Sequence, residues 1–248
     1  MAWVVDLDGV VWLSLRPIPG AAEAIARLRA AGEDVVFVTN NSGPTVEMVE
    51  SQLDAIGIPA AGSVVTSAQA AAQLLEPGST ALLCAGEGAA QALEARGVRT
   101  VGEGPADAVV VGFHRSFDYD AMCRASRAVL AGARLVATNA DATYPTPDGP
   151  IPGGGAILAS IVAATGVDPE VAGKPNRPIV DLVRARYGPS GVAVGDRPET
   201  DGLFARELGY RFALVLTGIT RADDLPVTPE PDHVADDLLA LLEMLGIP

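Results

Sequence analysis

Two carboxylates stand two residues apart at the end of an apolar segment, in Val5-Asp6-Leu7-Asp8-Gly9. Side chains at positions i and i+2 of an extended strand point to the same side, so Asp6 and Asp8 can face one ligand. Two such carboxylates repel each other unless a cation lies between them or one keeps its proton. The spacing indicates metal binding or acid–base chemistry, although a solvated turn with glycine at positive φ explains it equally well when taken alone.

A second apolar segment, residues 35–38, is followed by Thr39-Asn40-Asn41-Ser42 and then by Gly43-Pro44. Hydroxyl, amide and free backbone N–H groups at the entrance of a helix suit a phosphate group. Helix capping with an Asx turn is the better explanation of this loop in isolation. The candidate phosphate-binding residues are Thr39, Asn40 and Asn41.

Lys174 is the single lysine among 17 basic residues, the other 16 being arginine. The chain otherwise uses arginine wherever it needs a positive charge, so its one lysine is expected to have a specific role at its position. The alternative is that Lys174 lies on a solvated surface and is a lysine by chance.

A fourth loop, Gly195-Asp196, follows the apolar segment 192–194 and precedes a further carboxylate, Asp201. Oxygen-rich loops of this kind fit Mg²⁺. Four such loops favour one site, because open α/β sheets bind ligands beyond the carboxyl ends of their strands.

Short β-branched segments alternate with amphipathic Ala/Leu-rich segments, which predicts an α/β fold with a parallel sheet. The predicted strands cover 2–5, 35–38, 64–65, 81–84, 108–111, 135–138, 192–194 and 213–216. The predicted helices cover 20–31, 45–56, 68–75, 88–96, 119–131 and 200–208, part of 149–167, a segment after Pro175, and a C-terminal helix from about 237 with Asp236 as its cap.

Composition excludes several classes of protein. With 248 residues, 49% of them apolar, the chain can form a compact core and is not disordered. A net charge of −14 argues against nucleic acid and anionic membranes as partners. The absence of a signal-peptide pattern, together with Cys84 and Cys123 as two expected buried thiols, predicts a cytoplasmic protein without a disulfide framework or zinc cluster.

The order of the four loops resembles that of the haloacid dehalogenase (HAD)-type phosphohydrolases. Asp6-Leu7-Asp8-Gly9-Val10 looks like the first motif of that family, Thr39-Asn40-Asn41 the second, Lys174 the third, and Gly195-Asp196 through Thr200-Asp201 the fourth. The insertion before Lys174, with Thr138-Asn139-Ala140-Asp141 and Pro152-Gly153-Gly154-Gly155, is similar to the C2-capped NagD-like and p-nitrophenylphosphatase-like subgroup. The resemblance implies a Rossmann-like core at 1–76 and 170–248, and a smaller α/β C2-type cap at 77–169.

The resemblance also implies a division of roles for Mg²⁺-dependent hydrolysis of a small phosphomonoester. Asp6 would be the nucleophile that forms an aspartyl-phosphate, and Asp8 the general acid and base. The remaining roles are phosphate binding by Thr39, Asn40, Asn41 and Lys174, Mg²⁺ binding by Asp6, the Asp8 carbonyl and Asp196, and orientation of this set by Asp201. The substrate could be a glycerol phosphate, phosphoglycolate, a sugar phosphate or a nucleoside monophosphate, and a homodimer through the cap is the expected assembly.

Two other functions compete with this interpretation. A phospho-aspartyl signalling receiver also places acidic residues, a threonine and a lysine at strand ends, but it would be about half as long and would lack the second carboxylate at i+2. A catalytically weak HAD-like binding protein is the other, although every motif position is chemically intact. Candidate substrate-selecting residues of the cap are Asn139, Asp141, Tyr144 and His114, of which His114 more simply ends a strand.

Overall fold

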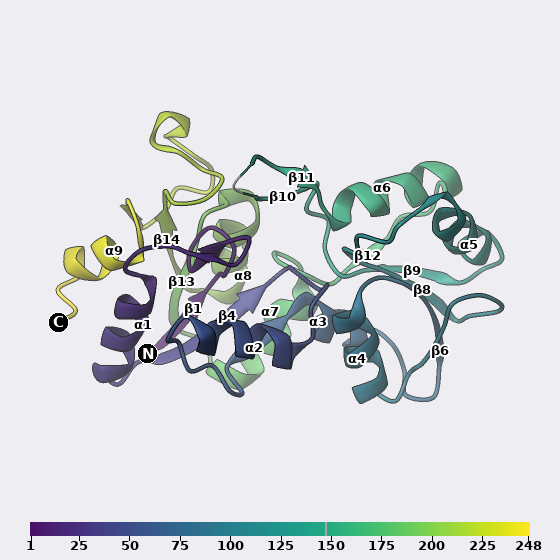
Figure 1. Cartoon of the computed structure of the whole chain (residues 1–248), viewed down its shortest axis with the longest axis horizontal. Coiled ribbons are helices and arrows are strands. Elements are labelled where there is room, and N and C mark those ends of the chain that lie inside the picture. Colours follow the sequence, from purple (N-terminus) through teal and green to yellow (C-terminus); the bar gives the residue numbers. More distant parts are fainter. Residues whose placement is uncertain (147) are drawn as a thin grey trace.

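The computed structural model describes residues 1–146 and 148–248 and contains two parallel sheets (Figure 1). The first sheet has six strands in the order β15-β14-β13-β1-β4-β5, and the second has five in the order β12-β9-β8-β6-β7. The strands of the first are β1 (Ala2–Val5), β4 (Asp34–Thr39), β5 (Val64–Thr66), β13 (Gly191–Gly195), β14 (Arg211–Val215) and β15 (His233–Ala235). Those of the second are β6 (Thr80–Cys84), β7 (Arg99–Val101), β8 (Ala108–Val111), β9 (Arg134–Ala137) and β12 (Glu170–Val171). Two short hairpins join β2 (Trp12–Leu13) to β3 (Arg16–Pro17) and β10 (Thr143–Tyr144) to β11 (Ile151–Pro152).

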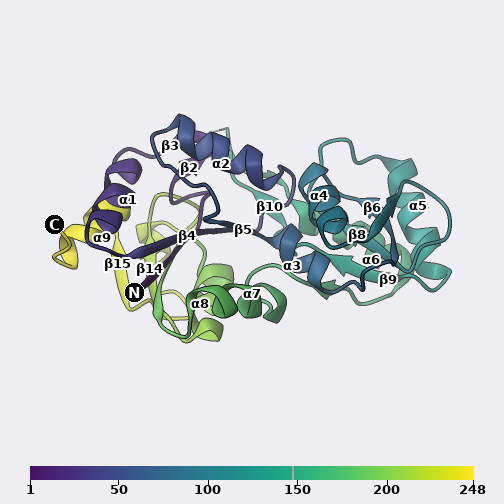
Figure 2. The same cartoon turned by 90° about the horizontal axis from the view of Figure 1, so that it is seen from below.

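Helices cover both faces of the first sheet (Figure 2). Trp3 and Val5 of β1 pack with α1 (Ala21–Ala30), α2 (Val46–Ala55) and α9 (Leu238–Met244). Ala2 and Val4 point the other way, toward α3 (Ser67–Gln73), α7 (Arg177–Tyr187) and α8 (Leu203–Leu208). Because both faces are buried, the strands are apolar along their length, as is typical of parallel sheets. The predicted α/β class with a parallel sheet is confirmed.

The second sheet is also covered on both faces. One face packs on α5 (Tyr119–Leu130) and α6 (Gly154–Thr165), while the other joins the apolar cluster that contains α3 and α4 (Glu87–Ala95). Strand β12 pairs with β9, so the chain leaves this sheet only after Val171, two residues beyond the predicted boundary. The division of the chain into a core and a cap domain stays a prediction.

Two local predictions are wrong. The predicted helix 200–208 is a π-helical turn over Pro198–Gly202 followed by α8, because the N–H of Asp201 and of Gly202 both bond to the carbonyl of Arg197. The C-terminal helix is capped by Asp237 and not by Asp236, since the Asp237 carboxylate accepts the Ala240 N–H at 2.8 Å.

Of the two cysteines expected to be buried, Cys84 is buried, but Cys123 is only half-buried. It lies on α5 beside the buried stripe formed by Ala121, Ala125 and Val129. Both thiols are free. Among residues 1–146 and 148–248, no helix has the length and apolar character needed to span a bilayer.

The loop after β4 joins the two sheets. The N–H of Gly88 in α4 donates to the Gly43 carbonyl at 2.9 Å, and the hydroxyls of Ser42 and Thr138 lie 2.8 Å apart. The approach is so close that a Cβ at Gly88 would lie 2.0 Å from the Pro44 carbonyl oxygen. The second sheet is therefore held against the loop that follows Thr39.

We expect Gly88→Ala to destabilise the protein. Alanine favours a helix by about 1 kcal/mol over glycine, but the added methyl must displace a backbone carbonyl, and overpacking of this kind costs about 1–3 kcal/mol. Urea unfolding should show a net loss in the free energy of unfolding. The control is Gly102→Ala, where the Cβ meets nothing within 4 Å. An increased stability of the Gly88 variant would contradict the close contact between α4 and the loop after β4.

Candidate active site

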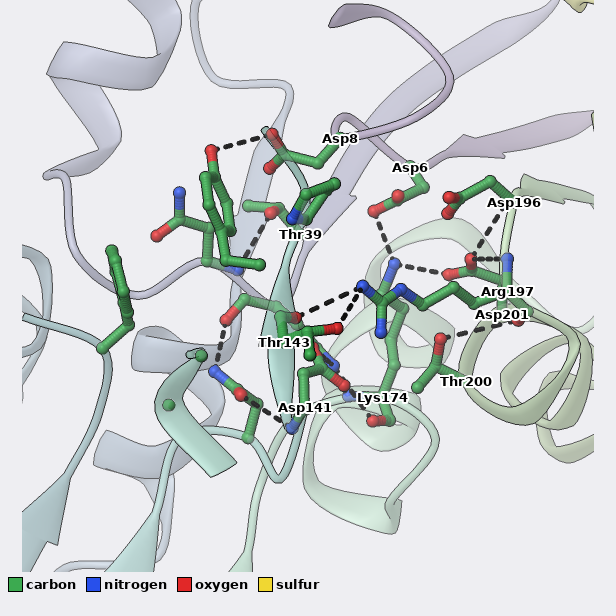
Figure 3. Close-up of a pocket in the computed structure, with 18 residues that line it drawn as sticks. Asp6, Asp8, Thr39, Asp141, Thr143, Lys174, Asp196, Arg197, Thr200 and Asp201 are labelled. Atoms are coloured by element: carbon green, nitrogen blue, oxygen red, sulfur yellow. Dashed lines mark hydrogen bonds and ion pairs between the residues drawn. The ribbon is translucent and has the colours of Figure 1, made fainter. Parts of the chain in front are cut away.

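The four predicted loops meet at the carboxyl edge of the first sheet, around a cavity of about 50 Å³ (Figure 3). Strand β1 lies between β13 and β4, so Asp6, Asp196 and Thr39 stand at the ends of three neighbouring strands. All of the predicted site residues line the cavity: Asp6, Asp8, Thr39, Asn40, Asn41, Lys174, Asp196 and Asp201. The sequence therefore identified one site and not four separate turns.

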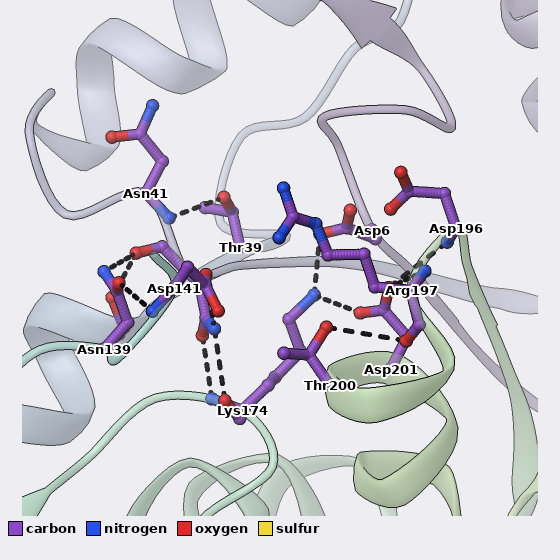
Figure 4. Close-up of polar contacts among 12 residues, drawn as sticks. Asp6, Thr39, Asn41, Asn139, Asp141, Lys174, Asp196, Arg197, Thr200 and Asp201 are labelled. Atoms are coloured by element: carbon purple, nitrogen blue, oxygen red, sulfur yellow. Dashed lines mark hydrogen bonds and ion pairs between the residues drawn. The ribbon is translucent and has the colours of Figure 1, made fainter. Parts of the chain in front are cut away.

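Lys174 occupies the centre of this cluster (Figure 4). Its Nζ lies 2.6 Å from Asp6 Oδ1 and 2.6 Å from Asp201 Oδ1, and only 4% of its side chain is exposed. Burial alone would lower the pKa of Lys174, but the carboxylates of Asp201 and Asp6 outweigh it and raise the pKa above its ordinary value. The single lysine is a buried, charged group, which excludes a position on a solvated surface.

Asp196 is packed between backbone segments. Its Oδ2 accepts the Ile219 N–H at 2.6 Å, and burial raises its pKa to about 7. A Cβ at Gly9, where φ is +97°, would lie 2.5 Å from Asp196 Cγ, and a Cβ at Gly218 would lie 1.9 Å from Oδ2. Glycine at both positions therefore gives this carboxylate its place beside Asp6.

Asp201 is fully engaged within the protein. Its Oδ2 accepts the backbone N–H groups of Asp196 at 3.2 Å and Arg197 at 3.1 Å, while Oδ1 binds Lys174. The π-helical turn brings Asp201 back to the start of its own loop. Its contacts suit a residue that orients the lysine and the Asp196 loop.

The donor set fits a divalent cation. Oxygens of Asp6, Asp196 and Asp201 lie within 4.8 Å of one another, and all three residues are buried. One ammonium cannot neutralise three carboxylates, and burial raises the pKa of Asp6 well above its usual range despite the opposing effect of Lys174. Hard divalent cations prefer oxygen ligands, so such an ion would supply the missing positive charge.

The loop after β4 uses its polar groups in three different ways. Thr39 Oγ1 accepts the Asn41 N–H at 3.0 Å, which leaves the hydroxyl proton to donate elsewhere. Asn41 Oδ1 accepts the Gly43 N–H at 3.1 Å, the Asx turn that the sequence allowed. The Asn40 carboxamide binds Lys174 through both backbone groups, accepting its N–H at 2.7 Å and donating to its carbonyl at 3.1 Å. Asn40 therefore positions Lys174, and any contact of Asn40 with phosphate would come from its backbone.

Asp8 has surroundings unlike those of Asp6. Its Oδ1 accepts the Tyr144 hydroxyl at 2.9 Å, and burial raises its pKa to about 6. One carboxylate is thus paired with an ammonium and its neighbour with a phenol. Two carboxyl groups in such different environments are typical of sites that need one as a nucleophile and one as an acid.

The second sheet contributes further residues to the cavity. Asn139, Asp141 and Tyr144 line it, whereas His114 is not among the described lining residues and follows β8.

Arg197 also lines the cavity, and its Nη2 donates to the Thr143 carbonyl at 3.2 Å. The motifs predict no role for Arg197, although a basic residue directly after Asp196 is a signal that could have indicated one.

Comparisons with known proteins agree with this geometry. A family model described as haloacid dehalogenase-like hydrolase matches residues 3–99, and one described as HAD-hydrolase-like matches 171–241. A D-glycerol 3-phosphate phosphatase from Mycobacterium tuberculosis is 37% identical, over 96% of this chain and 70% of that protein. An acid sugar phosphatase from Staphylococcus saprophyticus is 35% identical, over 98% of this chain and 97% of that protein. The chain belongs to the haloacid dehalogenase-like hydrolases.

Solved HAD structures share the whole architecture. A p-nitrophenyl phosphatase from Archaeoglobus fulgidus superposes with a TM-score of 0.89 at 30% identity, covering 98% of each chain. A glycerol phosphate phosphatase from Mycobacterium tuberculosis, solved with magnesium, gives 0.89 at 36% identity, covering 97% of this chain and 75% of that one. That enzyme has also been solved with calcium. The resemblance to the NagD-like and p-nitrophenylphosphatase-like subgroup is confirmed.

We expect Mg²⁺ to raise the melting temperature of the protein. Binding at a hundredfold excess over Kd contributes about 2.7 kcal/mol, which is roughly 5–10 °C for a chain of this size. Asp196→Asn should abolish the shift without lowering Tm in the absence of metal, because it removes one of the mutually repelling charges.

Asp223→Asn is the matched control, because Asp223 is exposed and is not among the described residues that line the cavity. It should keep the full shift. An Mg²⁺-induced shift that persists in the Asp196 variant would place the ion elsewhere.

Proposed function

We propose that this HAD-like hydrolase is a Mg²⁺-dependent phosphatase that cleaves a small phosphomonoester through an aspartyl-phosphate at Asp6. Its relatives named above are phosphatases, which makes hydrolysis of phosphoric monoesters the activity of this chain. The observation that carries the covalent mechanism is the contrast between two neighbouring carboxylates. Asp6 lies 2.6 Å from the buried Lys174 ammonium, while Asp8 is held separately by a phenol.

In the first step a carboxylate oxygen of Asp6 forms a bond to phosphorus as the bond to the leaving alcohol breaks. Negative charge then spreads over the phosphoryl oxygens, and positive or hydrogen-donating groups must face them. Lys174 supplies a fixed charge beside Asp6, and the free proton of the Thr39 hydroxyl can donate to a phosphoryl oxygen. Splitting hydrolysis into two displacements replaces one difficult step with two easier ones.

Asp8 moves the protons in both steps. Protonated Asp8 donates to the bridging oxygen, so that the leaving group departs as a neutral alcohol. The resulting carboxylate then takes a proton from the water that attacks phosphorus. The bond from phosphorus to the Asp6 oxygen breaks, which releases inorganic phosphate and restores the Asp6 carboxylate. Held by Asp6, Asp196 and the Asp8 carbonyl, Mg²⁺ would supply charge neutralisation to the nucleophile and the phosphoryl oxygens. Asp201 keeps Lys174 and the Asp196 loop in place.

Residues of both sheets line the cavity, so a substrate bound there would contact both of them. We propose that the second sheet and its helices act as a cap that excludes water and contacts the leaving group. Glycerol phosphate, phosphoglycolate, sugar phosphate and nucleoside monophosphate remain the candidate classes.

Continuous turnover distinguishes the enzyme from a signalling receiver or a weak binding protein. In Mg²⁺ the wild type should release many phosphates per chain from p-nitrophenyl phosphate, and EDTA should stop it. Asp6→Asn should lose activity by several orders of magnitude, since an amide is not a nucleophile but is nearly isosteric with the carboxylate.

Asp54→Asn, an exposed change on α2, is the matched control. More than roughly a tenth of wild-type kcat in the Asp6 variant, a loss of less than about 1.4 kcal/mol of barrier, would exclude the covalent mechanism. Release of a single phosphate per wild-type chain would instead favour the receiver.

Lys174→Arg tests whether the compact ammonium is needed. A planar guanidinium is too wide for a space bounded by Asp6 and Asp201 at 2.6 Å each. A displacement near 1 Å costs on the order of a hundredfold in rate, so kcat should fall at least about that much while the Mg²⁺-induced shift in Tm is mostly kept.

The matched control exchanges the same two residue types on the surface. Arg177→Lys changes a side chain that is 89% exposed and should leave kcat unchanged. A Lys174 variant within about twofold of wild type, under about 0.5 kcal/mol, would remove Lys174 from the mechanism.

A further inference from the structure

Tyr144 joins the hairpin of the predicted cap to a carboxylate at the end of β1. Its hydroxyl donates to Asp8 Oδ1 at 2.9 Å, across 136 residues of sequence, as the dashed line at Asp8 in Figure 3 shows. Tyr144 lies in β10, whereas Asp8 follows β1. The contact therefore spans the two parts of the molecule at the group that the proposed mechanism uses for proton transfer.

Contacts from three segments hold Tyr144 in place. Its ring stacks on Phe113, with centroids 5.4 Å apart and planes at 18°. The next residue, Pro145, accepts a hydrogen bond at 2.9 Å from Ser14 in the turn between β2 and β3. The preceding residue, Thr143, accepts from Arg197. The phenol is thus a fixed donor and not a freely rotating surface side chain.

This donor determines how Asp8 can work. Oδ1 accepts the phenol proton, and the carbonyl-type oxygen of a protonated carboxyl group is the better acceptor, so this hydrogen bond favours Oδ2 as the position of the transferable proton. Without the phenol, the carboxyl group could rotate and present its proton in other directions. A proton-transfer group contributes fully only when it is oriented toward the reacting atom.

We propose that Tyr144 is a positioning residue for Asp8, so that protonation of the leaving group depends on the cap hairpin lying over the site. The inference rests on the proposed function, in which Asp8 is the general acid. As the bond from phosphorus to the bridging oxygen breaks, the proton moves from Asp8 Oδ2 to that oxygen, and the electron pair of the broken bond stays on the alcohol. Tyr144 keeps its own proton throughout.

The experiment compares two substrates of nearly the same shape. Phenyl phosphate has a poor leaving group that needs a proton, whereas p-nitrophenolate is a stable anion that leaves without one. Tyr144→Phe keeps the stacked ring and removes only the hydroxyl. Its kcat/KM should fall about tenfold on phenyl phosphate, the loss expected for one hydrogen bond to an ionisable group, and by less than about twofold on p-nitrophenyl phosphate.

Tyr210→Phe is the matched control. It also removes one hydrogen-bonded hydroxyl from a buried tyrosine, whose partner is the Gly188 carbonyl at 2.7 Å, but Tyr210 does not belong to the described lining of the cavity. It should not change the ratio of kcat/KM for the two substrates, even if it lowers Tm.

Asp8→Asn separates failure of the inference from failure of the proposed function. It should show the same preference for p-nitrophenyl phosphate more strongly, and adding Tyr144→Phe to it should change the ratio no further. If Asp8→Asn lowers kcat/KM by the same factor for both substrates, the acid role of Asp8 is wrong.

If Asp8→Asn changes the ratio of kcat/KM for the two substrates and Tyr144→Phe does not, only the positioning role of Tyr144 is overturned. Equal losses of kcat/KM on both substrates in Tyr144→Phe would mean that Tyr144 has a purely structural role. Faster turnover of phenyl phosphate would mean that the phenol obstructs the site, which also contradicts the proposal.

Discussion

Three buried carboxylates share one buried ammonium at the edge of the first sheet, and the structure around them is arranged by that excess of negative charge. Charges removed from water are costly unless they are paired and hydrogen-bonded. Asp201 meets this condition through Lys174 and two backbone N–H groups. The Asp196 carboxylate accepts one backbone hydrogen bond, from Ile219, and has no ion pair with Lys174. Asp6 is paired with the Lys174 ammonium. The remaining negative charge is what a divalent cation would neutralise. In the proposed mechanism, a phosphoryl group would approach Asp6 only after that charge is neutralised.

Residues that follow β9 of the second sheet form hydrogen bonds with residues of this site. Asp141 accepts a hydrogen bond at 3.0 Å from the Asn40 carboxamide, which in turn binds both backbone groups of Lys174. From the hairpin, the Tyr144 hydroxyl donates a hydrogen bond directly to Asp8. The second sheet and its hairpin thus contact Asn40, which holds the proposed neutralising lysine, and Asp8, the proposed acid. Substrate selection and chemistry would then depend on the same set of contacts.

The sequence predicted the residues of the site better than their contacts. Motif order and the parallel sheet follow from apolar strands that end in polar groups, and they placed Asp6, Thr39 and Asp196 together. The hydrogen bonds of Asn40 to Lys174 could not be predicted, because they join residues 134 positions apart through a backbone whose path only the fold determines. Strands β12 and β15 are two and three residues long and carry too little pattern to be detected. The π-helical turn escaped prediction because its backbone N–H groups at Asp201 and Gly202 share the Arg197 carbonyl, and helix propensity does not distinguish this pattern from an α-helical turn.

Direct detection of the covalent intermediate tests the central claim. Asp8→Asn should still be phosphorylated by p-nitrophenyl phosphate, whose leaving group needs no acid, but it should lose the base that activates water for the second step. After an acid quench, intact-mass and peptide mass spectrometry should find one phosphoryl group per chain on the peptide that contains Asp6. The account predicts that this adduct forms in Mg²⁺ and is absent when Asp6 is also replaced by Asn. Release of p-nitrophenolate with no phosphoryl group on that peptide would contradict it.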